Sequence, residues 1–357
     1  MYSLSRTTLT EYLISQRRSH PGATGDFNAL VLQVATACKA ISRAVSHGAL
    51  GSVLGETDIT GFQGEPQTRL DALADSIFER STNWSGSLGG MVSEEREATI
   101  PLPKKHRRGK YLLVFDPLDG TSNIDVNLSV GSIFSVLRAP NPGKDATAAD
   151  FLQPGCHQVA AGYAIYGPAT MLVLSVGQGV AGFTFNPMMG EFFLTHPDMR
   201  VPPSTREFAI NASNSRFWEP PVKRYVEECL AGRSGPRGED FNMRWIASLV
   251  AEAHRILTRG GVFLYPRDHK DPSQADRLRL LFECNPIGYI IEQAGGRAST
   301  GEAPVLEVTP ESLHQHIGCV FGSAEEVALI ERYHAEPTPE RHQDLPLFKA
   351  RGLFLDA

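Results

Sequence analysis

The sequence predicts a mixed α and β fold, with a largely antiparallel sheet in the N-terminal half and a second α/β unit after it. Strand-like segments follow one another from residue 159 to residue 194 with only short turns between them, which is typical of an antiparallel meander. Segments with helical periodicity lie on both sides of this meander. The Pro-rich stretch 196–205 predicts the boundary between the two units.

Apolar residues recur at helical spacing in three segments before the meander. We therefore predict helices over residues 4–18, 27–46 and about 70–78. Residues 48–64 are rich in Gly, Thr and Asp and have no sustained period, so they predict a loop. The continuous apolar run 111–115 predicts a buried strand.

The remaining strands of the first unit are expected where short apolar runs end at Gly or Pro. They cover residues 130–137, 159–166, 170–176, 180–186 and 191–194, with a Pro/Asp/Ala loop over 140–155.

Beyond the boundary, strands and helices alternate. The predicted strands cover 207–211, 262–265 and 317–321, and the predicted helices cover 221–230, 245–257 and 325–334. Asn285 and Pro286 predict the N-cap and first residue of a further helix, which Gly295 and Gly296 end. We divide the chain into domains 1–200 and 201–335 and a loosely ordered tail, 336–357.

Composition and charge exclude several classes of partner. The net charge is −6 and the one basic run, 104–108, is short, so we expect no nucleic-acid partner. No apolar run reaches the length of a membrane span, so we expect no membrane-spanning segment, and we expect no signal peptide. The five cysteines are scattered without a Cys-x-x-Cys pair. We therefore expect reduced thiols and a cytoplasmic protein.

The stretch most suggestive of chemistry follows the strand 111–115. Asp116 and Asp119 flank Pro117, which donates no hydrogen bond, so the chain is expected to leave the sheet here. Residues 120–123 then offer backbone N–H groups and short donors. A cation and a phosphate could meet at this strand end. The alternative is an ordinary turn in which an Asp acts as a cap.

Further acids stand at the ends of predicted elements. The full set is Asp71, Glu94, Glu95, Asp116, Asp119 and Glu283. Oxygen-only donor sets suit Mg²⁺ or Mn²⁺, and no cluster of His and Cys accompanies them, so zinc is disfavoured. Two ions held by shared carboxylates can activate a water and neutralise a leaving oxygen. The sequence alone does not bring these acids together.

Seven segments resemble the class I fructose-1,6-bisphosphatases, within the wider inositol-monophosphatase-like sugar phosphatases. They are residues 92–95, 108–111, 115–125, 159–164, 248–255, 260–266 and 278–286. The resemblance extends from about residue 9 to residue 333. It implies a layered αβαβα fold and Mg²⁺-dependent hydrolysis of fructose 1,6-bisphosphate to fructose 6-phosphate and phosphate.

The resemblance also implies roles for individual residues. Two or more Mg²⁺ or Mn²⁺ ions would be held by Glu94, Glu95, Asp116, Asp119, Glu283 and the carbonyl of Leu118. Asp71 and Glu95 would orient and deprotonate the attacking water. The 1-phosphate would meet Asp119, Gly120, Thr121, Ser122 and Arg279, and the sugar and 6-phosphate would meet Asn211, Arg244, Trp245, Tyr265 and Arg277.

Assembly and regulation are implied in the same way. Arg244 of one subunit would reach a neighbouring subunit, which implies an oligomer, typically a tetramer. An AMP effector site would use Thr24, Gly25, Lys110, Tyr111 and Arg138. Trp245 stands where the family often has Tyr and Arg277 where it often has Lys, and the loop 51–64 is about three residues longer than in some relatives.

Several alternatives stay open at this point. Tyr265 and Trp245 could be packing residues, Glu283 could only complement a helix dipole, and Lys110 and Arg138 could be surface charges. Sedoheptulose 1,7-bisphosphatase activity is the nearest alternative function, alone or alongside. A non-catalytic sugar-phosphate or AMP sensor and an inositol monophosphatase are further alternatives. Gluconeogenesis and carbon fixation use the same reaction, so the pathway stays open.

Overall fold

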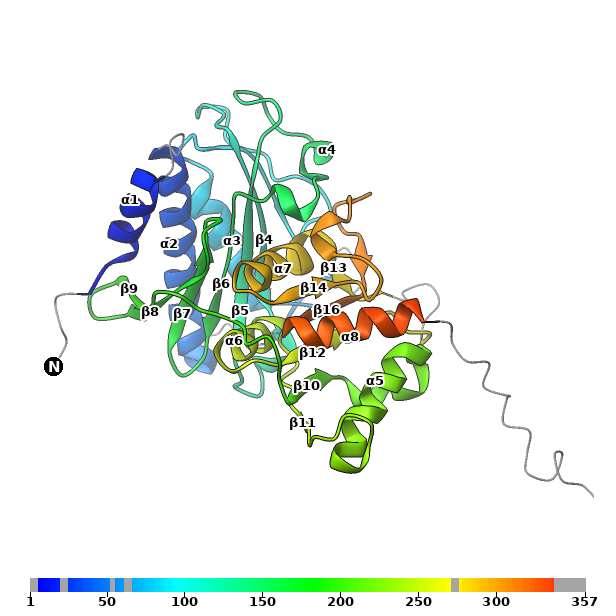
Figure 1. Ribbon diagram of the computed structural model, residues 1–357. Helices are drawn as coiled ribbons and strands as arrows, with labels where there is room; N and C mark the ends of the chain where they lie inside the picture. Colours follow the sequence, from blue (N-terminus) through cyan, green and yellow to red (C-terminus); the bar gives the residue numbers. More distant parts are fainter. Residues whose placement is uncertain (1–5, 20–24, 52–54, 61–65, 271–275, 337–357) are drawn as a thin grey trace, which may run out of the picture.

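The computed structural model describes residues 6–19, 25–51, 55–60, 66–270 and 276–336. The chain folds into layers of helices and sheets stacked in the order α, β, α, β, α (Figure 1). The expected layered architecture is therefore confirmed.

The larger sheet has seven strands in the order β3-β4-β5-β6-β7-β8-β9. They are Leu88–Ser93, Tyr111–Asp119, Val130–Arg138, Ala160–Tyr166, Thr170–Ser175, Ala181–Asn186 and Glu191–His196. Strands β3 and β4 are parallel and all other neighbours are antiparallel. The predicted meander and its antiparallel character are confirmed.

The smaller sheet has five strands in the order β11-β10-β12-β16-β14. They are Asn242–Met243, Glu207–Ile210, Val262–Tyr265, Cys319–Gly322 and Arg297–Ser299. Two further pairs of short strands lie outside both sheets, β1 (Glu56–Thr60) with β2 (Pro66–Thr68) and β13 (Leu278–Arg279) with β15 (His316–Ile317).

Helices fill the three remaining layers. Helices α1 (Leu9–Ser19), α2 (Gly25–His47) and α3 (Arg69–Thr82) cover one face of the larger sheet. Helices α6 (Leu249–Arg259) and α7 (Asn285–Gln293) lie between the two sheets, and α5 (Pro220–Ala231) and α8 (Ala324–Ala335) cover the far face of the smaller one. The middle layer therefore belongs to both sheets.

Among the described helices, α2 is long and apolar enough to cross a membrane by length and composition alone. Gln33, Lys39 and Arg43 interrupt its apolar residues, so the helix is not a continuous apolar run of that length. Its residues Leu30, Val34 and Ile41 are fully buried in the core that α2 shares with the larger sheet. An apolar stripe of this kind is what a core helix requires.

Several element boundaries differ from the expected ones. The predicted loop 48–64 contains the strand β1, because its backbone pairs with β2, and the loop 140–155 contains the short helix α4 (Ala148–Phe151). Helix α6 begins at Leu249 rather than at residue 245, because the Ser248 side chain caps it. Asn285 lies inside the helix and is not its N-cap, since a π-helical turn, Leu280–Cys284, precedes α7.

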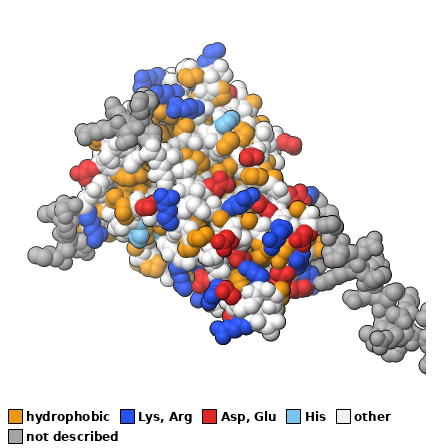
Figure 2. All heavy atoms as spheres, viewed as in Figure 1, with side chains coloured by type: hydrophobic (Ala, Val, Ile, Leu, Met, Phe, Trp, Pro, Cys, Tyr) orange, Lys and Arg blue, Asp and Glu red, His pale blue; other side chains and the backbone are white. Residues whose placement is uncertain are grey.

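Charged side chains of both signs are interspersed where α5 and α8 lie (Figure 2). Two ion pairs illustrate this, Arg224 with Glu228 at 3.1 Å and Arg297 with Glu331 at 2.6 Å. This part of the surface therefore lacks the single-sign character of a basic stripe.

Candidate active site

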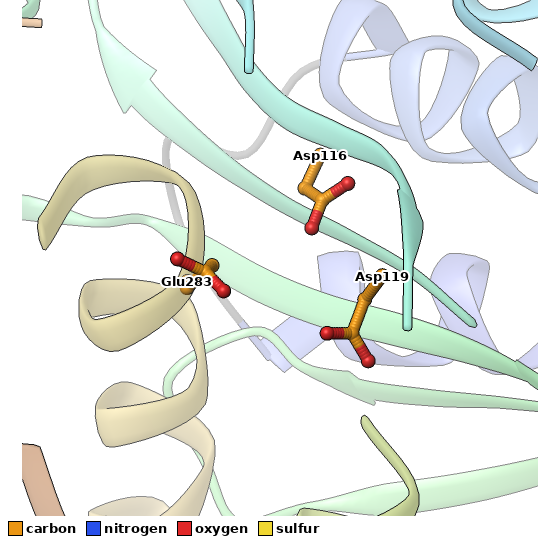
Figure 3. A group of neighbouring side chains, drawn as sticks. All are labelled: Asp116, Asp119 and Glu283. Atoms are coloured by element: carbon orange, nitrogen blue, oxygen red, sulfur yellow. The ribbon is translucent and has the colours of Figure 1, made fainter. Parts of the chain in front are cut away.

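The carboxylates of Asp116, Asp119 and Glu283 converge beside the end of strand β4 (Figure 3). One oxygen from each lies within 4.8 Å of the others, and all three residues are buried. Asp116 and Asp119 come from β4, and Glu283 comes from the π-helical turn before α7. Segments far apart in the sequence thus supply one group of acids.

A bulge in β4 explains how Asp116 and Asp119 share this place. In a regular strand, side chains three positions apart point to opposite faces of the sheet. Asp116 pairs with Ile133 and Asp119 with Gly131, so β4 holds one residue more than β5 across this interval. An extra residue turns the following side chain to the other face. The expectation that the chain leaves the sheet at Pro117 was wrong, because β4 accommodates it in this bulge.

The acids repel one another electrostatically. Burial raises the pKa of Glu283 to about 7, and burial also raises that of Glu94 to about 7, against the opposing charge of Arg279. The pKa of Asp116 is raised well above its usual value by burial and by the neighbouring carboxylates of Glu94 and Asp119. Protonation of the carboxylates or a bound cation would relieve the repulsion within such a buried cluster.

The cluster fits a hard divalent cation. Its donors are all oxygens, as Mg²⁺ and Mn²⁺ prefer. One arginine already balances part of the charge: Arg279 Nη1 lies 2.6 Å from Glu94 Oε1, and the Arg279 backbone N–H donates to Glu283 at 2.5 Å. The carbonyl of Leu118 faces the same region and accepts a hydrogen bond from the Thr121 hydroxyl at 3.2 Å.

Asp119 is fixed by the beginning of helix α6. Its carboxylate accepts hydrogen bonds from the Ser248 hydroxyl at 2.8 Å and from the backbone N–H groups of Val250 at 2.9 Å and Leu249 at 3.3 Å. Helix N-termini stabilise negative charge. Burial raises the pKa of Asp119, and these donors oppose that shift.

Asp71 lies at the start of helix α3 and has two partners. One carboxylate oxygen accepts from the backbone and hydroxyl of Thr68, at 2.9 and 2.7 Å, in a capping box. The other oxygen accepts from the Thr121 hydroxyl at 2.9 Å. Burial raises the pKa of Asp71 against these donors. Glu95 follows β3, and its backbone N–H donates to the Ser93 hydroxyl at 3.3 Å.

The loop after Asp119 packs closely on the start of α6. Gly120 has a φ of +81°, and a Cβ built there would lie 2.9 Å from the Cβ of Ser248. Only glycine meets both conditions without strain. Thr121 and Ser122 follow in a short 3₁₀ turn, and Ser122 is exposed. The loop therefore presents hydroxyl groups beside the acids.

The residues expected at the sugar end lie around an aromatic stack. The Trp245 ring stacks on Phe263 with ring centroids 5.8 Å apart, and Tyr265 lies 6.1 Å from Trp245. The sequence predicted Trp245 as the first residue of a helix, but Trp245 lies four residues before α6 begins. The buried Nε of Arg277 has no hydrogen-bond partner among the described residues.

Asn211 and Tyr265 line a small hollow next to this stack, together with Asp268 and Asn214. Asn214 is buried and donates to Asp268 at 3.2 Å. Arg244 instead turns toward its own chain, with its Nε 3.6 Å from Glu207.

The residues expected to bind AMP lie at the opposite end of β4. Tyr111 and Arg138 are paired across β4 and β5, and the Lys110 ammonium lies 5.8 Å from the Tyr111 ring. Gly25 begins helix α2, whose Phe27 packs against Tyr111 with ring centroids 5.8 Å apart. Thr24 lies outside the described residues, as does half of the longer loop over 51–64.

Sequence reasoning missed the residues that hold the acids. Thr68 and Ser248 are N-caps that donate to Asp71 and Asp119. Each is a Ser or Thr immediately before an apolar helical stripe, which is a readable N-cap signal. The link from each cap to a site acid depends on the tertiary fold and leaves no local pattern.

Comparison with known proteins places these features in a family. Residues 7–197 match the family model for the fructose-1,6-bisphosphatase N-terminal domain, and residues 201–335 match the model for the C-terminal domain. The chain is 65% identical over 350 residues to fructose-1,6-bisphosphatase class 1 of Hydrogenophilus thermoluteolus, covering 98% of this chain and 97% of the relative. It is 62% identical over 352 residues to a class 1 fructose-1,6-bisphosphatase of Methylibium petroleiphilum, covering 99% and 98%.

Solved structures agree with this assignment. Leishmania major fructose-1,6-bisphosphatase in its holo form is 37% identical, with a TM-score of 0.85, and the match covers 93% of this chain and all of that one. The same enzyme in its T-state is 37% identical with a TM-score of 0.80, covering 93% of this chain and 99% of that one.

Proposed function

The chain belongs to the fructose-1,6-bisphosphatase family and is a phosphatase of fructose 1,6-bisphosphate, and from this premise we propose how its residues divide the work. The reaction releases the 1-phosphate and leaves fructose 6-phosphate. The observation that carries the proposal is the convergence of Asp116, Asp119 and Glu283 next to the short turn that holds the hydroxyl groups of Thr121 and Ser122.

The family depends on divalent metals, and we assign the ligands to the acids at the end of β4. Glu94, Glu95, Asp116, Asp119, Glu283 and the Leu118 carbonyl would hold two or more Mg²⁺ or Mn²⁺ ions. When bound, these ions would lower the pKa of water and withdraw negative charge from the phosphate. The raised pKa values of Glu94 and Glu283 support this assignment, since a cation would remove the repulsion that burial creates.

Asp71 and Glu95 orient and deprotonate the attacking water. Asp71 suits this role because Thr68 and Thr121 fix both of its oxygens, so its free lone pairs have a set direction. Thr121 also belongs to the loop that would cradle the 1-phosphate, so one hydroxyl ties the base to the phosphate site. Arg279, with Gly120 and Ser122, completes the 1-phosphate contacts.

The 6-phosphate and the sugar occupy the region of Trp245, Tyr265 and Arg277, with Asn211 at its edge. The Nε of Arg277, which has no partner among the described residues, supports this assignment, because its buried N–H can donate to an anionic ligand at little further desolvation cost. In a homotetramer, Arg244 contacts the sugar and 6-phosphate bound by a neighbouring subunit. Relatives in the family are typically oligomeric.

Direct metal binding tests the ligand assignment. Isothermal titration with Mg²⁺ in the presence of the products, fructose 6-phosphate and phosphate, should give saturable binding, and Asp116→Asn should weaken it by at least about tenfold, ~1.4 kcal/mol. Asp150→Asn, which changes an acid of the helix α4 capping box outside the proposed ligand set, is the matched control. Equal Mg²⁺ affinity in wild type and Asp116→Asn contradicts the assignment.

We also propose that AMP inhibits the enzyme through Lys110, Tyr111 and Arg138, and that the protein acts in the cytoplasm. The pairing of Tyr111 with Arg138 and the position of Lys110 next to them support a nucleotide site at this end of β4. The five free cysteines support the location in the cytoplasm, which is a reducing compartment. Inhibition by AMP that is lost in Lys110→Ala tests the first proposal, and cell fractionation tests the second.

A further inference from the structure

Residues 244–248 connect strand β11 to helix α6 through a strained backbone. Ala247 has a φ of +60°, in the left-handed region that disfavours residues with a Cβ. Strain of this kind persists only where surrounding contacts hold the backbone in place. The question is which contacts do so here.

The peptide groups of Ile246 are held from both sides. Its N–H donates to the Glu252 carboxylate at 2.7 Å, and its carbonyl accepts from the Asn123 side chain at 3.1 Å. Asn123 is buried and ends the short 3₁₀ turn that contains Thr121 and Ser122. The strained turn is thus clamped between α6 and the candidate phosphate loop.

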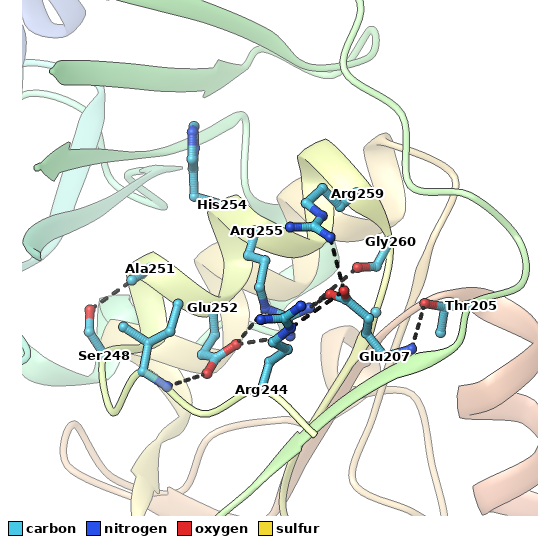
Figure 4. A network of polar contacts seen from close by, with 12 residues as sticks. Thr205, Glu207, Arg244, Ser248, Ala251, Glu252, His254, Arg255, Arg259 and Gly260 are labelled. Carbon is cyan, nitrogen blue, oxygen red and sulfur yellow. Dashed lines mark hydrogen bonds and ion pairs between the residues drawn. The ribbon is translucent and has the colours of Figure 1, made fainter. Parts of the chain in front are cut away.

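Glu252 is itself fixed by an ion-pair chain. Its carboxylate is fully buried and accepts from Arg255 at 2.9 and 3.1 Å. Arg255 also donates to Glu207 on β10 at 2.8 Å (Figure 4). Removing one partner from a buried, fully bonded charge leaves the others unsatisfied. The ion pairs with Arg255 therefore hold the Glu252 carboxylate beside the Ile246 N–H.

Both ends of the turn carry residues of the site. At one end, Trp245 stacks on Phe263. At the other, Ser248 and Val250 donate to Asp119 at 2.8 and 2.9 Å. A change in the backbone at Ile246 and Ala247 would therefore shift Asp119 and Trp245 together.

We propose that Glu252 is a positioning residue for the phosphatase reaction. By accepting from the Ile246 N–H, it keeps Ala247 in its strained conformation. The turn then fixes the position of Trp245 relative to Asp119. Its effect on turnover rests on the proposed function, whereas its effect on the backbone does not. The competing account is that Glu252 is only a buried ion pair that stabilises the fold.

Glu326 supplies a matched control. It is also buried, accepts from the Tyr225 hydroxyl at 2.6 Å and pairs with Arg237 at 2.6 Å. It lies in the core between α5, α8 and the smaller sheet, away from the acids. Glu326→Gln removes a comparable buried charge without touching the turn.

Hydrogen exchange of the metal-free protein, followed by mass spectrometry, measures the turn directly. Glu252→Gln should speed exchange in a peptide covering 244–250 by at least about tenfold, because glutamine offers one acceptor oxygen where the carboxylate offers two, so the Ile246 N–H and Arg255 compete for it. Glu326→Gln should leave that peptide unchanged. Adding Ala247→Gly to Glu252→Gln should slow exchange again, since glycine adopts the turn without strain.

Phosphate release provides the second readout. Glu252→Gln should lower kcat and raise KM for fructose 1,6-bisphosphate, with kcat/KM reduced at least about tenfold. Ala247→Gly in the same chain should recover most of that loss, and Glu326→Gln should keep kcat/KM within about twofold of wild type once corrected for folded protein. If wild type releases no phosphate, the proposed function fails and the exchange result still decides the role of Glu252.

Two results overturn the proposal. One is equal exchange of peptide 244–250 in wild type and Glu252→Gln. The other is a loss of activity that Glu326→Gln reproduces and that Ala247→Gly does not reverse. If Glu252→Gln does not fold, Asn123→Ala removes the clamp from the other side and should give the same exchange and recovery pattern.

Discussion

At the scale of single residues, the site depends on acids placed where they are electrostatically unfavourable. Asp116, Asp119 and Glu283 are buried within one cluster, and Arg279 balances only part of their charge. Such an arrangement destabilises the metal-free fold and is relieved by a cation. We therefore expect a cation bound at the proposed metal site to stabilise the fold.

This linkage gives a pH-dependent prediction for Glu283→Gln in EDTA. The pKa of Glu283 is about 7 in the folded protein, against 4.5 as its ordinary value. The folded state therefore binds more protons than the unfolded chain between pH 4.5 and 7, so the wild type loses stability as the pH rises through this window. Glutamine has no such penalty, and at pH 7.5 the metal-free variant should be more stable than wild type by about 3 kcal/mol.

Urea denaturation at pH 5 and pH 7.5, with EDTA and with Mg²⁺, measures this difference. Mg²⁺ should stabilise the wild type and reverse the order of the two proteins at pH 7.5. A metal-free wild type that is as stable as Glu283→Gln at pH 7.5 contradicts the electrostatic account.

The sequence predicts the residues of this cluster better than their geometry. The Asp116–Asp119 motif and the family resemblance identify the acids. The bulge that turns Asp119 toward Asp116 has no local signature, because it appears only in the register of β4 against β5. Glu283 reaches the cluster through a π-helical turn that resembles an ordinary helix start in the sequence. The bulge and the position of Glu283 both depend on contacts between segments far apart in the sequence.

At the scale of elements, helix ends hold the site acids. Helix α3 begins with a capping box in which Asp71 is both cap partner and candidate base. Helix α6 begins at Leu249, and its first N–H groups donate to the Asp119 carboxylate. Periodicity predicts the bodies of such helices well, but the expected start of α6 was four residues early because Trp245 and Ile246 continue its apolar pattern. The cap that sets the true start, Ser248, is therefore the informative residue.

Thr68→Ala should affect both stability and the pH profile. It removes a helix cap, which costs about 1 kcal/mol. It also removes a donor that stabilises the Asp71 carboxylate, so the pKa of Asp71 should rise and the acid limb of kcat/KM should move to higher pH.

Thr147→Ala is the control, since Thr147 and Asp150 form the same capping box on helix α4. It should lower stability without moving the pH profile. Urea denaturation and pH–rate curves on both variants test this. An unchanged acid limb in Thr68→Ala would exclude Asp71 as the base whose protonation limits the rate.

At the scale of the whole molecule, the two sheets share one middle layer. Helices α6 and α7 contribute Ile256 and Ile290 to the core that joins both sheets. The boundary at 196–205 separates the sheets along the sequence, but the core is continuous across it. Composition and periodicity predict each layer; only the packing of α6 and α7 shows that the layers depend on one another.

Unfolding should accordingly be a single transition. Ile290 is fully buried in the shared core, and Ile290→Ala should lower stability by about 2–5 kcal/mol for the chain as a whole. Leu230→Ala, at a side chain that is 69% exposed, should change it by less than about 0.5 kcal/mol. Calorimetry that resolves two transitions, with Ile290→Ala shifting only one, contradicts the shared core.

The most direct test of the central claim is phosphate release from fructose 1,6-bisphosphate and sedoheptulose 1,7-bisphosphate, with Mg²⁺ and with EDTA, by wild type and Asp119→Ala. We expect Mg²⁺-dependent release that is faster from the fructose substrate, stops in EDTA and is abolished in Asp119→Ala. Folded wild-type protein that releases no phosphate from fructose 1,6-bisphosphate, or that releases it equally well after Asp119→Ala, contradicts the assignment of the site.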